Sequence, residues 1–194
     1  MRAHPDRIRW NERYAADQPC FTPHPLLAEA LSAGFPAGPV LELACGRSGS
    51  ALALAARRRT VVAVDVSDLA LTQLAGEADR RGLRGYLECV EADVPSYDPG
   101  RRRFGLVLAT LYWDPAAFRA GCEAVLPGGL IGWEALAADE PRQWRVSHGE
   151  LGAGLPADFE VLTEALVISG RRRSTRLLAR RRHDPSRTNS ASNG

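Results

Sequence analysis

The stretch Val40-Leu-Glu-Leu-Ala-Cys-Gly-Arg-Ser-Gly-Ser-Ala-Leu-Ala-Leu-Ala55 decides the fold of this chain. A short apolar run that contains Glu42 stops at small residues and resumes as an Ala- and Leu-rich run. This pattern predicts a strand, a tight turn and a helix. Glycines in such a turn let a ligand approach the backbone, and the first turn of the helix offers unpaired N–H groups. The stretch therefore predicts a seat for a nucleotide-type ligand.

A second apolar run, Thr60-Val-Val-Ala-Val-Asp65, ends in a carboxylate nineteen positions after Gly46. An acid at this point of a βαβ unit accepts hydrogen bonds from ribose hydroxyls, which predicts an adenosine-containing ligand. The turn Ala44-x-Gly46-x-x-Gly49 is one substitution from the G-x-G-x-x-G pattern, so a nicotinamide-dependent oxidoreductase using NAD(P) is an alternative. A carboxylate at Glu42 would repel a pyrophosphate, and therefore favours a cofactor with cationic groups.

Three further segments follow in order. Residues 86–95 predict a third strand that ends in Asp93, residues 104–110 predict a fourth, buried strand, and Pro127-Gly128-Gly129 predicts a turn into a fifth. With these segments the chain resembles the class I S-adenosylmethionine (AdoMet)-dependent methyltransferases. Glu42 and Gly46 are in register with the motif acidic-x-Gly-x-Gly-x-Gly of that family, whereas Ala44 and Ser48 replace glycines. Residues 6–14 and 63–67 look most like the small bacterial branch of tellurite-resistance and thiopurine-type methyltransferases.

The resemblance implies an α/β fold: a doubly wound, Rossmann-like, seven-stranded sheet, mostly parallel, with an antiparallel C-terminal hairpin strand. It also implies methyl transfer from AdoMet to a small-molecule acceptor, a reaction that requires no invariant catalytic residue. By the resemblance, the cofactor-binding set comprises Glu42, Ala44, Gly46 and Gly49 at the methionine end, Asp65 and Val66 at the ribose, Asp93 and Val94 at the adenine, and Ala109. The altered glycines at Ala44 and Ser48 leave a non-catalytic AdoMet-binding protein as a further alternative.

Residues 1–35 are expected to form a helical lid segment, because the first helix of this family often lies across the cofactor. In that arrangement Arg13 would pair with the methionyl carboxylate and Trp10 would close over the site. The alternative is an amphipathic helix in which Trp10 and Tyr14, four residues apart, pack on the sheet. Spacing alone leaves both interpretations open.

Acceptor-side residues are expected after the fourth strand and before a late short helix. Tyr112 and Trp113 are interpreted as aromatic walls for a flat acceptor or as caps of the core, and Asp114 as the start of a helix at Pro115. His148 and Glu150 are interpreted as a base or as helix caps, with capping favoured. Residues 109–115 lack the [Asn/Asp/Ser]-Pro-Pro-[Tyr/Phe] signature of enzymes that methylate amino groups of nucleic acids, which disfavours a nucleic-acid partner.

Composition predicts one domain, because 194 residues with 45% hydrophobic content suffice for one substantial core. We expect the domain to span residues 1–183 and the polar residues 184–194 to form a disordered tail. No run approaches the ~20 apolar residues of a membrane span, and the N-terminus has no signal-peptide core, so a cytoplasmic location is expected. The scattered Cys and His residues predict no metal site.

All 25 basic residues are arginines, and the net charge is only +2. Arginine triplets at 57–59, 101–103, 171–173 and 180–182 fall at expected element boundaries, which favours solvated charge over a phosphate-tracking surface. The oligomeric state is left open.

Overall fold

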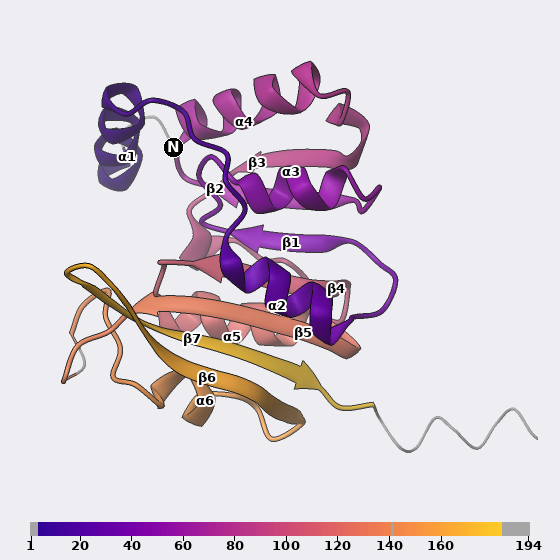
Figure 1. The fold of residues 1–194 in the computed structure, drawn as a ribbon, viewed down its shortest axis with the longest axis vertical. Helices are drawn as coiled ribbons and strands as arrows, with labels where there is room; N and C mark the ends of the chain where they lie inside the picture. The colour runs from indigo at the N-terminus through magenta and orange to yellow at the C-terminus, as the bar shows by residue number, and fades with distance from the viewer. Residues whose placement is uncertain (1–3, 141, 184–194) are drawn as a thin grey trace, which may run out of the picture.

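The computed structural model describes residues 4–140 and 142–183, so the predicted tail at 184–194 lies outside the described residues. Its centre is a seven-stranded sheet of order β3-β2-β1-β4-β5-β7-β6 (Figure 1). The strands are β1 (Val40–Leu43), β2 (Val61–Asp65), β3 (Leu87–Glu91), β4 (Phe104–Thr110), β5 (Val125–Leu136), β6 (Phe159–Ser169) and β7 (Arg172–Arg181). β1 to β5 pair in parallel, and β7 runs antiparallel to both β5 and β6. The predicted fold class is confirmed.

Helices cover both faces of the sheet, as a sheet buried on both sides requires. They are α1 (Pro5–Ala16), α2 (Pro25–Ala33), α3 (Gly49–Ala55), α4 (Asp68–Arg80), α5 (Pro115–Ala124) and α6 (Glu150–Ala153), with 3-10 turns η1 (Arg84–Tyr86) and η2 (Val94–Ser96). α2, α3 and α4 bury Leu26, Leu52 and Leu74 against one face. α5 and α6 bury Phe118 and Leu151 against the other, where Trp133 meets the Phe118 ring edge-on at 5.1 Å. The chain order reverses between β1 and β4, which is the switch point where doubly wound sheets form a crevice at the carboxyl ends of the strands.

Side-chain caps explain where several helices begin. Ser67 accepts a hydrogen bond from the backbone N–H of Ala70 and starts α4, and α4 packs on β2 and β3. Asp114 accepts from the N–H groups of Ala116 and Ala117 and starts α5, which confirms that Asp114 begins the helix at Pro115. Each cap orients the helix that follows a strand at the carboxyl edge of the sheet.

Two expectations need correction. The predicted turn at Pro127-Gly128-Gly129 is an irregularity inside β5, since the pairing register with β4 shifts there. A Cβ on Gly129 would lie 2.9 Å from the Gly105 carbonyl oxygen, so the close approach of two backbones requires a glycine. The arginine triplet 180–182 is not simply solvated. Arg181 is buried, and its guanidinium pairs with Asp158 and donates to three backbone carbonyls near the end of α5.

Candidate functional site

The turn between β1 and α3 contains two residues in the left-handed region of backbone space. Gly46 has φ +53°, and Ala44 has φ +49°. The left-handed region costs a glycine little, whereas the Cβ of alanine makes it strained. Ala44 therefore adopts the backbone conformation of the glycine that it replaces in the motif, and the turn keeps its shape despite the substitution.

Asp65, at the carboxyl end of β2, holds this turn in place. Its Oδ2 accepts the N–H of Gly46 at 2.7 Å, and its Oδ1 accepts the N–H of Ser67 at 2.8 Å. The side chain is buried, and burial raises the pKa of the carboxyl group, while the backbone N–H bonds act in the opposite direction. One carboxylate thus fixes the glycine turn relative to the start of α4.

Glu42 lies in the middle of the sheet beneath the same turn. Its Oε2 accepts the hydroxyl of Ser48 at 2.7 Å, and the Ser48 oxygen accepts the N–H of Ala51 at 2.9 Å, which caps α3. The Glu42 side chain is fully buried, and this burial raises its pKa to about 7. Glu42 therefore supports the turn from below and places a titratable group under the start of α3.

The two motif glycines make room for other parts of the chain itself. A Cβ on Gly46 would collide with the hydroxyl of Tyr14, and a Cβ on Gly49 would collide with the backbone carbonyl of Phe21. Tyr14 belongs to α1, and Phe21 to the segment that leads into α2. The segment 14–21 therefore passes directly over the glycine turn.

Polar contacts hold α1 across the carboxyl ends of β2 and β3. Asn11 donates to Asp68 at 2.7 Å and accepts the Ser67 hydroxyl at 2.6 Å, at the N-terminus of α4. Arg7 pairs with Asp68 at 2.5 Å and with Glu91 at 3.3 Å. No residue of α1 is buried, so side-chain hydrogen bonds and ion pairs, rather than an apolar core, attach this helix.

The structure places Trp10 and Arg13 on α1 away from the turn residues. The Trp10 ring stacks on Tyr14 with a centroid separation of 5.9 Å, and the Arg13 guanidinium lies 5.3 Å from the Trp10 centroid. The Arg13 side chain is 67% exposed and lies 3.9 Å from Asp17. Tyr14, rather than Trp10 or Arg13, makes the contact with Gly46. The pairing of Arg13 with a cofactor carboxylate stays a prediction.

The remaining predicted cofactor residues differ in accessibility. Asp93 follows β3 with 29% of its side chain exposed, accepts the Ser96 hydroxyl at 3.0 Å and lies 3.8 Å from His4. Val66 is half-buried beside Asp65. Val94 and Ala109 are buried in the core on the α5 side of the sheet. Asp65 and Asp93 thus mark the ends of neighbouring strands, while Ala109 packs beneath the crevice.

Sequence reasoning missed a buried polar cluster at the carboxyl end of β5. Glu134 accepts the Ser174 hydroxyl at 2.7 Å and the Nε of Arg176 at 2.6 Å, and Arg176 also pairs with Glu29 at 2.8 Å. His24 Nε2 lies 3.4 Å from Glu134, and burial lowers the His24 pKa. These residues come from three segments distant in sequence, so no local motif signals the cluster.

His24 has a fixed tautomer in this cluster. Its Nδ1 accepts the backbone N–H of Leu26, so Nε2 carries the proton and faces Glu134. Its backbone N–H donates to the hydroxyl of Ser50 in α3 at 2.9 Å. His24 therefore links the glycine turn to the end of β5, with both ring nitrogens engaged.

On the acceptor side, Tyr112 and Trp113 pack against the core on the α5 side, and Asp114 caps α5. Burial raises the Tyr112 pKa, so its hydroxyl is neutral at neutral pH. Glu150 accepts the N–H of Ser147 at 2.9 Å at the start of α6, as its capping interpretation predicts. His148 instead lies 3.0 Å from the Thr175 hydroxyl through Nδ1.

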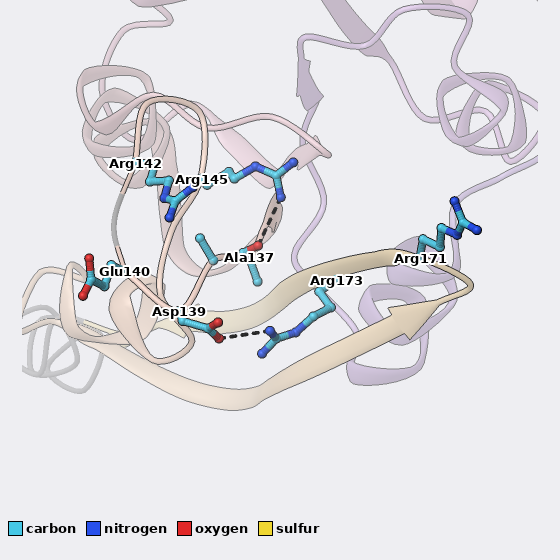
Figure 2. Close-up of a pocket in the computed structure, with 8 residues that line it drawn as sticks. Ala137, Asp139, Glu140, Arg142, Arg145, Arg171 and Arg173 are labelled. Atoms are coloured by element: carbon cyan, nitrogen blue, oxygen red, sulfur yellow. Dashed lines mark hydrogen bonds and ion pairs between the residues drawn. The ribbon is translucent and has the colours of Figure 1, made fainter.

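Two open cavities adjoin each other beyond the end of β5. The larger, of about 600 Å³, is drawn in Figure 2 and is lined by Ala137, Ala138, Asp139, Glu140, Arg142, Arg145, Arg171 and Arg173. The smaller, of about 240 Å³, shares residues with it and adds Ser147, His148 and Leu166. Within the described residues no group of three or more His, Cys, Asp or Glu side chains could hold a metal ion. No helix among residues 4–140 and 142–183 is long and apolar enough to cross a membrane.

Residues 40–129 match the family model of the methyltransferase domain. A curated relative, the 2-heptyl-1-hydroxyquinolin-4(1H)-one methyltransferase of Mycobacteroides abscessus, is 33% identical over 101 residues, which are 51% of this chain and 44% of the relative. The chain thus aligns with less than half the length of that relative. The family-model match over residues 40–129 includes the motifs around Glu42 and Asp65.

Solved structures share the fold at low identity. TehB from Haemophilus influenzae has a TM-score of 0.71 and 16% identity, covering 91% of this chain and 67% of its own. The 1,6-didemethyltoxoflavin-N1-methyltransferase of Burkholderia thailandensis has a TM-score of 0.67 and 19% identity, covering 91% and 84%. The [4+2]-cyclase SpnF has a TM-score of 0.69 and 19% identity, and the match covers 92% of this chain and 94% of the SpnF chain. Residues 40–129 thus match a methyltransferase domain, and the described chain shares the fold of these solved structures.

Proposed function

We propose that this protein transfers a methyl group from AdoMet to a small-molecule acceptor. The observation that carries the proposal is the glycine turn at the switch point of the sheet, where Asp65 ends β2 and Asp93 follows the end of the adjacent parallel strand β3. In doubly wound folds this crevice is the ligand site. The methyltransferase-domain match over residues 40–129 supports the same conclusion. Two similar proteins are named for methylating a hydroxyquinolone and a toxoflavin precursor, both small molecules.

The residues around the turn fit AdoMet. Carboxylates at Asp65 and Asp93 can accept hydrogen bonds from ribose hydroxyls and from the adenine amino group, respectively. A carboxyl group at Glu42 beneath the turn would repel a pyrophosphate wherever it is ionised and would attract a cationic ligand, which argues against the nicotinamide alternative. Gly46, with no side chain of its own, leaves its backbone open to a ligand once Tyr14 moves aside. Arg13 would then hold the methionyl carboxylate.

The residues of the chain mainly orient the acceptor and exclude water from the reaction, and contribute less to proton transfer. When bound, AdoMet supplies a methyl group already activated by its sulfonium. Tyr112 is neutral, and His24 has both ring nitrogens engaged, so neither stands ready as a base at neutral pH. This arrangement suits an acceptor that is already nucleophilic, held in line with the methyl group and shielded from water by α1.

A second candidate function comes from the structural likeness to the cyclase SpnF, which covers 92% of this chain. The same fold thus carries a reaction that is not named as methyl transfer. A protein of that kind would not transfer a methyl group. The non-catalytic alternative raised by Ala44 and Ser48 likewise predicts no methyl transfer.

Calorimetric titration of the full chain with AdoMet, S-adenosylhomocysteine and NADH tests the proposal. We expect binding of both sulfur nucleotides and none of NADH. Micromolar NADH affinity with no response to either sulfur nucleotide would overturn the proposal. Each of a panel of phenols, thiols and N-hydroxy heterocycles would then be incubated with the protein and AdoMet that carries a tritiated methyl group. Transfer of the labelled methyl group to an acceptor would distinguish methyl transfer from cofactor binding alone.

We also propose that residues 1–35 act as a lid on one domain that extends to residue 183, and that the protein works in the cytoplasm. Reduced thiols support that location, since Cys20, Cys45, Cys89 and Cys122 are all free. A small-molecule acceptor without a nucleic-acid partner is supported by the scattered, largely paired arginines along the described chain.

A further inference from the structure

The larger cavity beyond β5 has a backbone floor and walls of arginine. Its floor is the strand-like segment 137–139, where the Ala137 N–H bonds to the Arg173 carbonyl and the Ala138 N–H bonds to the Val146 carbonyl. One wall is a tight turn closed by two backbone hydrogen bonds between Arg142 and Arg145. The other wall is the β6–β7 hairpin, with Arg171 in its turn and Arg173 at the start of β7. Figure 2 shows these two walls on either side of Ala137. We call this cavity the arginine pocket.

The arginine pocket carries excess positive charge. Its lining contains four guanidinium groups against the carboxylates of Asp139 and Glu140. Arg173 pairs with Asp139 at 3.0 Å, and Arg145 donates to the Ala137 carbonyl at 3.3 Å. The guanidinium groups of Arg142 and Arg171 make no hydrogen bond or ion pair with any residue in the described part of the chain. Two donors with fork geometry, suited to carboxylate or phosphate, therefore remain available at one cavity.

The position of the arginine pocket connects it to the proposed reaction. Thr110, the last residue of β4, pairs with Glu134 of β5, and Ala137 follows three residues later. At about 3.3 Å per residue, the floor of the pocket lies roughly 10 Å beyond the end of β4. Under the proposed function, on which this step rests, the methyl donor lies over the ends of β1 and β4. A volume of about 600 Å³ is also within the range of small-molecule sites.

We infer that the methyl acceptor carries an anionic group, a carboxylate, phosphate or sulfonate, which the arginine pocket binds. The reactive atom of such an acceptor lies roughly 10 Å from its anionic group, the span between the pocket floor and the end of β4. Arg142 and Arg171 are specificity residues in this arrangement. They select the acceptor and take no part in the chemistry.

Two naphthalenes test the inference because they differ only in a carboxylate: 6-hydroxy-2-naphthoate and 2-naphthol. Each is titrated calorimetrically into the full chain saturated with S-adenosylhomocysteine. We expect the naphthoate to bind about tenfold more tightly, since hydrogen bonds to charged groups are stronger than neutral ones. The variant Arg142→Gln/Arg171→Gln should lose that preference. The matched control Arg57→Gln/Arg101→Gln removes two exposed arginines at the opposite, amino-end edge of the sheet and should keep it.

The outcomes separate this inference from the proposed function. Failure of S-adenosylhomocysteine to bind the parent protein rejects the proposed function, and with it the acceptor role of the pocket. With that binding intact, equal affinity for the two naphthalenes, or a preference that persists in the Arg142/Arg171 variant, overturns the inference. An equal loss of the preference for the naphthoate in both double variants would show only a general electrostatic attraction to the positively charged protein, and would also overturn the inference. Inorganic pyrophosphate should displace the naphthoate but bind more weakly, and tighter binding of pyrophosphate would mean that the pocket serves a free anion.

Discussion

Replacing Glu42 by glutamine should change how the stability of this protein depends on pH. Glu42 lies in the central strand β1, is fully buried, and accepts one hydrogen bond from the Ser48 hydroxyl at 2.7 Å. Glutamine has the same shape, and its side-chain carbonyl can accept the same bond. The substitution therefore removes an ionisable group from the core and leaves the packing of the glycine turn intact.

The magnitude follows from the pKa. Burial raises the pKa of Glu42 from its ordinary value of 4.5 to about 7. Between these values the unfolded chain has lost the proton and the native protein keeps it, so unfolding releases a proton and the free energy of unfolding falls as pH rises. The contribution is fully present below pH 4.5 and is lost as pH rises through 7. At about 1.4 kcal/mol per pKa unit, the full effect is about 3 kcal/mol.

Urea unfolding of the parent and Glu42→Gln at intervals from pH 4.5 to 8 measures this effect. The free energy of unfolding of the variant, minus that of the parent, should rise by about 3 kcal/mol across this range. The lowered pKa of His24 acts with the opposite sign, but it is common to both proteins and cancels in the difference. Glu160→Gln, a change at an exposed position on β6, should give a flat difference. A flat difference for Glu42→Gln as well would refute the burial argument.

Four further substitutions test the turn and the lid. Ala44→Gly should relieve the strain of the left-handed backbone at this position. The free energy of unfolding should therefore rise by about 0.5–1 kcal/mol, measured as a higher urea midpoint, and a lower midpoint would contradict the strain argument. Asn11→Ala removes both bonds to the start of α4 and should speed tryptic cleavage in α1 with an unchanged melting temperature, whereas unchanged cleavage would place the attachment elsewhere. Asp65→Asn should weaken S-adenosylhomocysteine binding about tenfold by calorimetry, and equal affinity would remove Asp65 from the ribose site. Arg13→Ala should weaken AdoMet far more than 5′-methylthioadenosine, which lacks the carboxylate, and equal losses would exclude that contact.

Three of the parallel strands could be predicted from local signals, since β1, β2 and β4 are short, mainly apolar runs that are buried almost throughout. The extent of β5 could not be predicted from local signals. Glu134 interrupts its apolar pattern, and the charge is tolerated because Arg176 pairs with it from β7, 42 residues later. A sequence pattern shows a charge inside a strand but not the partner that neutralises it, so long-range pairs of this kind escape sequence reasoning.

The candidate site likewise has features that could be predicted from the sequence and features that could not. The turn at Gly46 and its link to Asp65 could be predicted, because both residues belong to one βαβ unit of fixed geometry. The contact of Tyr14 with Gly46 could not be predicted from the sequence. Helical spacing groups Trp10 with Tyr14, yet says nothing about where that helix docks, and the docking depends on Asn11 reaching Ser67 from a distant part of the chain.

This docking links the structure of the lid to the order of binding. The Tyr14 hydroxyl lies where a side chain of Gly46 would be, directly over the backbone that a cofactor approaches in this fold. Because α1 buries no side chain in the core and is attached by partly exposed polar contacts, each worth about 1 kcal/mol or less, its displacement costs far less than unfolding of the sheet. Under the proposed function, the cofactor would therefore enter by moving α1 alone. Closure of α1 afterwards would exclude water from the crevice, while the arginine pocket beyond β5 remains open to the acceptor.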